Sequence, residues 1–426
     1  MNSKCRITGE PLIECVALGD QYITDFVQPG SSQSHTKAPL RLGIAPQTGT
    51  AQLFDTVDPK EMYDRYWYES GINASMREHL YSIADHAQGF VSLDRNDVVL
   101  DIAANDGTLL SQYPEHVTRL GIDPSSVARF SAAYGGKIQL VNDFFSKQAY
   151  ESATSRKAKI VTVIAMFYDL SDPASFLADV RNIIAEDGVL IIQLSYTPLM
   201  LAQREFGNIC HEHVFYHTLH SLRSLLEEAG FNLIDAQLND TNGGSLRVYA
   251  TPLERPEKLK CPLHWLSIGA ARLNSLFAYE KNLELNTPLP YLKFAREIEE
   301  LKKQTIAWLE EQRVRKKLVV GYGASTKANV LLQYYGITSE LLPCIAEANK
   351  NKLGLATIGS EIPIISEAEM RKMKPDYLLA LPWFFISYFM KREEDLLNSG
   401  TRFIVPQPEL TVIEHNKQFQ RSLAAA

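Results

Sequence analysis

Three consecutive side chains in the middle of the chain, His211, Glu212 and His213, combine two imidazoles with a carboxylate, and the thiol of Cys210 precedes them. Histidine suits general-base catalysis, because its ordinary pKa of about 6.5 leaves the imidazole mostly neutral at neutral pH. The segment therefore predicts an enzyme that removes a proton. Metal binding by His211 and His213 is the alternative, since alternate residues of an extended segment face the same side. The sequence offers no evident third ligand, so we predict no metal here.

The elements that must position this segment belong to an α/β fold, because short apolar stretches alternate with helical patterns around it. The predicted strands of a first sheet are 98–101, 119–122, 138–141, 160–164, 189–194, 232–235 and 246–250. A helix over 219–229 ends at a glycine, and an aromatic helical pattern covers 61–88. The predicted strands of a second sheet are 318–321, 343–345, 377–380 and 403–405.

This pattern divides the chain into four units. Residues 1–60 are rich in turn formers and predict a small β-rich lobe. Residues 61–255 hold the first sheet and predict a seven-stranded Rossmann-like domain. Residues 256–315 are a charged helical connector, and residues 316–415 predict a second Rossmann-like α/β domain.

Carboxylates follow the first three predicted strands, and in doubly wound sheets such residues bind the ribose of a cofactor that lies over the switch point. The turn after the first strand lacks the three glycines of a dinucleotide-binding loop, so it offers few backbone N–H groups to a pyrophosphate. A cofactor with a ribose and no phosphates fits better, and S-adenosylmethionine is such a molecule. The residues predicted to bind it are Asp101, Ala103, Asn105, Gly107, Asp123, Asp143 and Phe144.

The second predicted sheet opens in a similar way, with a strand, a glycine turn and a helix start over residues 319–329. Backbone N–H groups at that helix N-terminus, together with Lys327, form an anion site. Glu347 ends the following strand as Asp123 does in the first sheet. Taken alone, this turn is compatible with an NAD site or with a nucleotide fold kept as a scaffold.

Several motifs, taken in order, carry a family likeness over nearly the whole chain. They are DIAANDGTL at 101–109, ICHEH at 209–213, NGGSLR at 242–247, GYGASTKAN at 321–329, EAN at 347–349 and LPW at 381–383. Together they resemble the motifs of bacterial sugar C-methyltransferases that act on nucleotide-linked 4-keto-6-deoxy sugars.

The resemblance implies methyl transfer from S-adenosylmethionine to C3 of such a sugar. The 4-keto group acidifies the C3 hydrogen, a base removes it, and the enolate carbon attacks the sulfonium methyl. By this likeness His213 is the base, and Glu212 binds a sugar hydroxyl or tunes the imidazole. The enolate oxygen needs a donor, for which the candidates are Tyr66, Tyr68, His211 and Tyr216.

By the same likeness, the C-terminal domain helps to bind the nucleotide and diphosphate of the substrate. An arginine can reach such a diphosphate, because its guanidinium makes bidentate contacts to phosphate oxygens. The residues expected to bind substrate are Arg247, Gly244, Ser245, Gly323, Lys327, Asn329 and Glu347.

The chain departs from the family in two places. Members usually open with two Cys-x-x-Cys pairs that bind zinc, whereas here the corresponding residues are Cys5, Thr8, Ala45 and Thr48. A tetrahedral zinc site needs four N or S donors, so even with Cys15 recruited we predict no zinc and a lobe held by its apolar core. The second departure is Cys210, where the family commonly has a tyrosine.

Composition limits the partners. The net charge of -7 argues against general nucleic-acid binding, which needs clustered cations. No apolar stretch approaches about eighteen residues and none follows the N-terminus, so we expect a cytoplasmic protein with neither a membrane span nor a secretory signal. The five cysteines show no Cys-x-x-Cys spacing and spell out no disulfide framework. The expected partner is a small nucleotide sugar, and the expected assembly is a monomer or homodimer.

Three other functions stay open at this stage. An N- or O-methyltransferase would need a base near a heteroatom but no exchangeable carbon proton. An NAD-dependent oxidoreductase would use the C-terminal unit. A non-catalytic ligand-binding protein derived from such an enzyme is conceivable, but the intact Glu212 and His213 oppose it.

Overall fold

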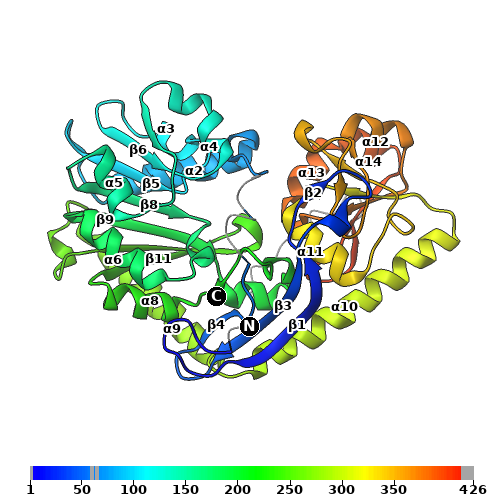
Figure 1. Ribbon diagram of the computed structural model, residues 1–426, viewed down its shortest axis with the longest axis horizontal. Helices are drawn as coiled ribbons and strands as arrows, with labels where there is room; N and C mark the ends of the chain where they lie inside the picture. The colour runs from blue at the N-terminus through cyan, green and yellow to red at the C-terminus, as the bar shows by residue number, and fades with distance from the viewer. Residues whose placement is uncertain (1–2, 58–61, 63–66, 414–426) are drawn as a thin grey trace.

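The computed structural model describes residues 3–57, 62 and 67–413. Figure 1 shows two α/β units next to each other, with the strands of an N-terminal lobe between and below them. The long helix α10 (Leu289–Val314) crosses the lower edge of this view from the lobe to the second unit. The predicted fold class, two Rossmann-like α/β sheets with a small lobe, is confirmed.

The first unit is built on a seven-stranded sheet in the order β11-β12-β9-β8-β5-β6-β7. Its strands are β5 (Val98–Ile102), β6 (Thr118–Ile122), β7 (Ile138–Val141), β8 (Ala158–Ile164), β9 (Ile184–Ser195), β11 (Asn232–Asn239) and β12 (Ser245–Thr251). Parallel neighbours flank β5 on both sides, β6 on one and β8 on the other. Every strand predicted for this sheet is present. The carboxyl end of β5 is therefore the switch point at which doubly wound sheets bind their ligands.

The residues of β5 explain its central place. All of them are buried and apolar except Asp101, as expected for a parallel strand that is covered on both faces. Leu100 packs on the face covered by α6 (Pro173–Ile183) and α8 (Leu219–Glu228). Val99 packs on the opposite face, which α2 (Ala74–Gln88) covers, because successive side chains of a strand alternate. The shorter helices of this unit are α3 (Thr108–Ser111), α4 (Ser126–Phe130), α5 (Lys147–Ala153) and α7 (Thr197–Ala202).

The helical pattern expected over 61–88 is wrong for residues 67–73, which directly precede α2. These residues form a loop and one 3₁₀ turn. The backbone N–H groups of Ser70 and Gly71 donate to the side chains of Asn105 and Asp106 at 2.9 and 2.6 Å. Their hydrogen bonds are thus satisfied by tertiary contacts and no helix is needed.

The second unit has a six-stranded sheet in the order β16-β14-β13-β17-β18-β19. Its strands are β13 (Val319–Tyr322), β14 (Ile345–Glu347), β16 (Ile364–Ser366), β17 (Tyr377–Ala380), β18 (Arg402–Val405) and β19 (Thr411–Ile413). The strand predicted over 343–345 lies two residues later, because Pro343 has no N–H for a sheet ladder. The helices are α11 (Thr326–Tyr335), α12 (Glu367–Met373), α13 (Ile386–Arg392) and α14 (Glu394–Asn398).

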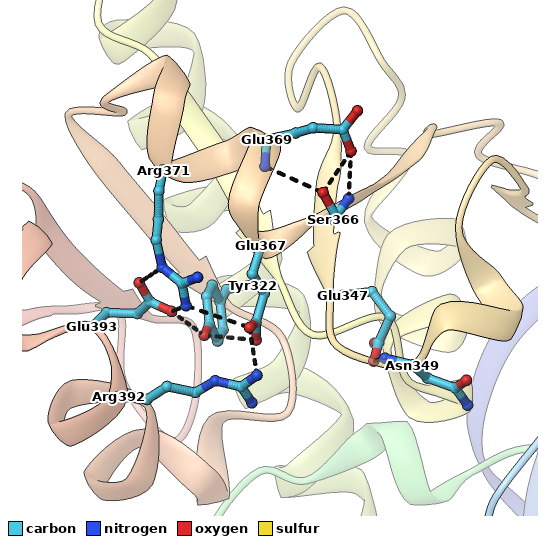
Figure 2. Close-up of polar contacts among 9 residues, drawn as sticks. All are labelled: Tyr322, Glu347, Asn349, Ser366, Glu367, Glu369, Arg371, Arg392 and Glu393. Carbon is cyan, nitrogen blue, oxygen red and sulfur yellow. Dashed lines mark hydrogen bonds and ion pairs between the residues drawn. The ribbon is translucent and has the colours of Figure 1, made fainter.

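An ionic cluster with buried carboxylates and partly exposed arginines, drawn in Figure 2, anchors α12 and α13 beside β13. The carboxylate of Glu393 accepts two hydrogen bonds from Arg371, and the Tyr322 hydroxyl lies 2.7 Å from the same carboxylate. Glu367 lies 3.0 Å from that hydroxyl and forms an ion pair with Arg392. Because each of these charges has a partner, we assign the cluster a structural role.

The N-terminal lobe joins both units through backbone pairing. Its antiparallel sheet has the order β1-β3-β4-β10, with β1 (Ile13–Tyr22), β3 (Lys37–Ala45), β4 (Thr50–Leu53) and β10 (Phe215–Tyr216). The last strand comes from the first unit, just after the predicted catalytic segment. A second pairing joins β2 (Phe26–Val27) to β15 (Ala356–Thr357) of the second unit. The lobe is therefore joined to both units by backbone pairing.

Two helices connect the units, α9 (Leu263–Asn282) and α10. The buried carboxylate of Glu280 on α9 accepts from the Tyr196 hydroxyl at 2.7 Å and from the backbone N–H groups that begin α8. This contact fixes the connector on the first sheet. Within the described part of the chain, no helix has the length and apolar character needed to cross a bilayer.

Candidate active site

The predicted catalytic segment lies between the 3₁₀ turn η5 (Phe206–Asn208) and β10. His213 Nδ1 lies 2.8 Å from the Asn208 carbonyl oxygen. A carbonyl only accepts, so Nδ1 carries the hydrogen and Nε2 keeps a lone pair. The ring of Tyr168 packs against the imidazole with centroids 4.2 Å apart. His213 is therefore held as the tautomer that a general base at Nε2 requires.

Charge and burial keep this imidazole neutral. Burial and, to a smaller extent, the positive charge of Lys327 together lower the pKa of His213 to about 3, while the hydrogen bond to the Asn208 carbonyl opposes them. Lys327 begins α11 in the second unit, where its Nζ donates to the Asn242 carbonyl at 2.8 Å and lies 5.2 Å from the ring centre of Phe384. The second unit thus places a cation beside the histidine of the first.

The pKa of Glu212 is shifted in the opposite direction. Burial raises the pKa of its carboxyl to about 7, and the nearby Asp25 also raises it, while a hydrogen bond from Thr24 Oγ1 at 3.1 Å lowers it. Both protonation states are therefore populated near neutral pH. The hydroxyl donor comes from the N-terminal lobe, so the site is assembled from all three parts of the chain.

The turn geometry separates the two histidines. His213 N donates to the Cys210 carbonyl, so the segment is not extended, and His211 turns away to donate from Nε2 to Ala38 O at 3.2 Å. Among the described residues, donor atoms of Cys210, Glu212 and His213 instead lie within 4.8 Å of one another. The Lys327 ammonium beside them would repel a metal cation, so we still expect none.

The tyrosine candidates differ in their placement. Tyr216 is buried and its hydroxyl donates to the Asn208 carbonyl at 3.1 Å, the same oxygen that holds His213. Tyr68 is 45% exposed beside the predicted cofactor loop, where its carbonyl accepts from Asn105 Nδ2 at 2.9 Å. Tyr66 lies outside the described residues. Tyr216 is therefore placed to position the base, and its hydroxyl already has an acceptor.

A small cavity of about 10 Å³ lies beside His213, lined by Tyr168, Ser195, Asn208 and Tyr216 among others. A space of this size holds about one water. The sequence did not single out Tyr168, Asn208 or Thr24. Tyr168 follows β8 at the switch point, so the rule used for the other strand ends would have found it. Thr24 and Asn208 carry no such signal.

The predicted cofactor loop has the backbone of a glycine loop although it holds only one glycine. Ala103, Asn105 and Gly107 all have left-handed φ angles, of 59°, 53° and 77°. Asparagine tolerates this conformation, whereas alanine is strained in it. The Asn105 side chain also accepts from Ser70 N and donates to Tyr68 O, both at 2.9 Å. Tertiary contacts thus replace the conformational freedom of glycine.

The cofactor loop of the first unit and the glycine turn of the second are each held by a carboxylate that accepts hydrogen bonds from backbone N–H groups. Asp123 follows β6, and its oxygens accept from Asn105 N and Ser125 N, each at 2.8 Å. Glu347 ends β14, and its oxygens accept from Ala324 N and Asn349 N, each at 2.7 Å. Figure 2 shows Glu347 and Asn349 apart from the ionic cluster. In each unit the carboxylate of the second strand pins the loop of the first.

The other predicted cofactor residues lie at different depths. Asp101 is buried, accepts from Thr162 Oγ1 at 2.6 Å, and has a pKa raised to about 7, chiefly by burial. Asp143 and Phe144 are exposed at the end of β7. The structure therefore brings Asp101 and Asp123 together near the loop and leaves Asp143 and Phe144 at the rim.

A larger cavity of about 520 Å³ lies between the two units. Its lining includes Trp67, Glu69, Asp106, Ser131 and Asn351. It borders the cofactor loop through Asp106, but the residues predicted at the strand ends do not line it. We expect the chemistry in the His213 region, because there the predicted base lies beside the carboxyl of Glu212 and the charge of Lys327.

The expected substrate residues on the first unit shape the turn before β12. Gly244 has φ of 122°, and an added Cβ would approach Leu199 Cδ1 to 2.9 Å, so only glycine fits. The Ser245 hydroxyl donates to Thr241 O at 2.9 Å. Arg247 is buried, and its Nε donates to Gln193 at 3.0 Å. The Arg247 guanidinium thus has partners inside the first unit, and its contact with a diphosphate stays a prediction.

On the second unit, Gly323 has φ of 86°, and a Cβ would meet Pro382 Cγ at 2.7 Å. Asn329 is fully buried, and its side chain donates to Asp25 O at 2.9 Å. That contact ties α11 to the lobe beside Glu212, and the role of Asn329 in binding substrate stays a prediction. Among these residues, Lys327 is the one whose charge lowers the pKa of His213.

Comparisons with known proteins find similar methyltransferases. A family model described as a methyltransferase domain matches residues 76–236, and one described as the C-methyltransferase C-terminal domain matches residues 240–408. The C-methyltransferase NovU of Streptomyces niveus is 26% identical over 418 residues, which cover 95% of this chain and 97% of that protein.

Solved methyltransferases share weaker likenesses. CalO1, a methyltransferase of calicheamicin biosynthesis in its SAH-bound form, is 14% identical with a TM-score of 0.32 over 42% of this chain and 54% of that chain. The magnesium protoporphyrin IX methyltransferase of Synechocystis, with bound SAH, is 14% identical with a TM-score of 0.32 over 43% of this chain and 89% of that chain. At such scores these likenesses add no argument of their own.

Proposed function

We propose that this chain, which is an S-adenosylmethionine-dependent C-methyltransferase, methylates C3 of a nucleotide-linked 4-keto-6-deoxy sugar through an enolate. The observation that carries the proposal is the neutral His213, whose Nδ1 donates to Asn208 and whose Nε2 keeps a lone pair. A methyl acceptor at carbon needs such a base, because carbon becomes nucleophilic only when a proton next to a carbonyl is removed.

The proton balance is simple. His213 Nε2 takes the C3 proton, the electrons of that bond move into the C3–C4 bond, and the C4 carbonyl oxygen becomes an enolate oxygen. The ammonium of Lys327 is close enough to lower the pKa of His213. We propose that it also stabilises the negative charge of the enolate. As that negative charge forms, the imidazolium becomes easier to hold, so a pKa near 3 in the free enzyme does not prevent catalysis.

Glu212 assists from the other side. In its ionised form the carboxylate accepts a hydrogen bond from a sugar hydroxyl and makes His213 a stronger base, because an opposite charge favours the imidazolium. The hydroxyl of Thr24 holds one oxygen of this carboxylate. The other oxygen lies 3.9 Å from the Cys210 sulfur, and Cys210 itself is a buried thiol whose pKa is raised well above the ordinary value by burial.

The cofactor supplies an electrophilic methyl group when bound. Its proposed site is the carboxyl end of β5 and β6, where the left-handed turn of Ala103, Asn105 and Gly107 keeps side chains off the loop. Asp123 lies at that edge with both oxygens engaged by backbone N–H groups, each oxygen keeping a further lone pair for a ribose hydroxyl. The second unit, through the loop at Gly323, is proposed to bind the nucleotide and diphosphate.

The test is hydrogen exchange in D2O with a panel of nucleotide-linked 4-keto-6-deoxy sugars, followed by mass spectrometry and NMR. Deuterium should enter C3 without cofactor, and a methyl group should appear there with S-adenosylmethionine. His213→Gln should abolish both, whereas His116→Gln, at an exposed histidine, should leave both unchanged. Methylation at oxygen or nitrogen without C3 exchange would contradict the enolate route and support a heteroatom methyltransferase.

A further inference from the structure

Two turns at the base of the N-terminal lobe have the same backbone. In the first, Gly9 N donates to the Cys5 carbonyl, and in the second, Gly49 N donates to the Ala45 carbonyl, each at 2.8 Å. Both glycines are left-handed, with φ of 73° and 67°, a conformation that glycine adopts without strain. The lobe thus holds two matching turns, one before β1 and one between β3 and β4.

The family resemblance implies zinc between these turns, but the residues present do not fit it. Cys5, Thr8, Ala45 and Thr48 offer one thiol, two hydroxyls and a methyl group, whereas tetrahedral zinc needs four N or S donors. Cys15 does not complete the set, because its sulfur donates to a carbonyl of its own strand and packs in the core. Among the described residues, the group with close metal-ligating atoms belongs to the active site and not to this lobe.

A carboxylate joins the two turns instead. Glu10 is only 8% exposed, and its Oε1 accepts from Thr8 Oγ1 at 3.4 Å and from Thr48 Oγ1 at 3.0 Å. Oε1 also accepts from Thr48 N at 3.2 Å, and Oε2 accepts from Gln47 N at 2.9 Å. Hydrogen bonds to an ionised carboxylate are roughly twice as strong as those between neutral groups. Two of the three positions that lack the family's cysteine, Thr8 and Thr48, thus bind one carboxylate.

We propose that Glu10 takes the place of the metal ion: its carboxylate cross-links the two turns, and the lobe keeps its shape with no ion bound. The second turn leads directly into β4, where Ala51 pairs with Tyr216 of β10. The Tyr216 hydroxyl donates to the Asn208 carbonyl, which also accepts from His213. Glu10 is thus connected to the backbone that holds the predicted base, through the second turn, β4 and β10.

The first experiment measures zinc and stability in the full chain. Wild-type protein purified without a metal-binding tag should contain far less than one zinc per chain, and a strong chelator should not change its thermal midpoint. Glu10→Ala should lower the midpoint. Glu10→Gln keeps the shape of the side chain but loses its charge, so its midpoint should lie between those of wild type and Glu10→Ala. Asp20→Ala, at an exposed carboxylate of β1, is the matched control and should change nothing.

A metal-restoring variant separates this role from general destabilisation. Thr8→Cys, Ala45→Cys and Thr48→Cys, with Cys5, supply four thiolates, so in the Glu10→Ala background this variant should bind one zinc per chain. Its midpoint should rise with zinc and fall with the chelator. The proposal is overturned if wild type holds one zinc whose removal unfolds the lobe, if Glu10→Ala leaves the midpoint unchanged, or if zinc does not rescue the variant. None of these readouts depends on the sugar substrate.

Discussion

The matching roles of Asp123 and Glu347 lead to a prediction that separates the two ligands. Each carboxylate accepts two backbone N–H groups, one from the loop it pins and one from its own turn. Asp123→Asn and Glu347→Gln keep the size of the side chain but replace one acceptor oxygen by an NH2 group. That group then faces a backbone donor, so one charge-assisted hydrogen bond is lost in the affected unit.

The magnitude follows from the number of bonds. A hydrogen bond to a charged group contributes about 1.5–3 kcal/mol. If the whole loss falls on the ligand-bound state, affinity drops by roughly tenfold to a hundredfold, since about 1.4 kcal/mol corresponds to a factor of ten. Asp123→Asn should lower the affinity for S-adenosylmethionine by that factor. The affinity for nucleoside diphosphates should stay within about twofold of wild type, because the substitution does not touch the other loop. Glu347→Gln should do the reverse.

Isothermal titration calorimetry on the full chain measures both affinities for each variant, with S-adenosylhomocysteine as a stable cofactor analogue and a panel of nucleoside diphosphates. Glu340→Gln, at an exposed carboxylate of the second unit, is the matched control. If Asp123→Asn weakens both ligands equally, or neither, then the carboxylate does not act through its own loop and the reasoning from this geometry is refuted.

Three further predictions concern the predicted base, the residues beside it and the cofactor loop. The value of kcat/KM should rise with pH through about 7 as Glu212 ionises, and Glu212→Gln should flatten that rise; a rise that persists belongs to another group. Lys327→Met should raise the pKa of His213 in an NMR titration, because a neighbouring positive charge is removed, and yet slow C3 exchange by about 10²–10³; unchanged exchange would exclude the enolate role. Asn105→Ala should cost about 1–2 kcal/mol more stability than Asn105→Gly, because φ is 53° there, and equal thermal shifts would count against backbone strain.

The strands of the first sheet could be predicted because their information is local. A run of buried apolar residues such as Val98–Ile102, followed by a carboxylate or a turn, needs no partner to be recognised. The prediction of a helix failed where contacts with residues distant in sequence determine the backbone conformation. Residues 67–73 carry a helical and aromatic pattern, yet Asn105 and Asp106, far along the chain, take their N–H groups. The later start of β14 has a local cause that the sequence shows, because Pro343 has no N–H to donate to a neighbouring strand.

The candidate site shows the same division. The types and spacing of Glu212 and His213 indicated acid/base chemistry from the sequence alone, and the strand ends indicated where a cofactor binds. Which residues surround the base could not be read in that way. Thr24, from the lobe, and Lys327, from the second unit, are each separated from it by more than a hundred residues in sequence.

The sequence by itself thus indicated which side chains could move a proton and in which unit of the chain they lie. Only the tertiary structure decided the state of those side chains. The tautomer of His213 depends on the carbonyl that accepts its Nδ1 hydrogen, and the opposite pKa shifts of His213 and Glu212 depend on burial and on charges from other units. These quantities are set by distances in space, because solvation and Coulomb energies depend on neighbours and not on chain order.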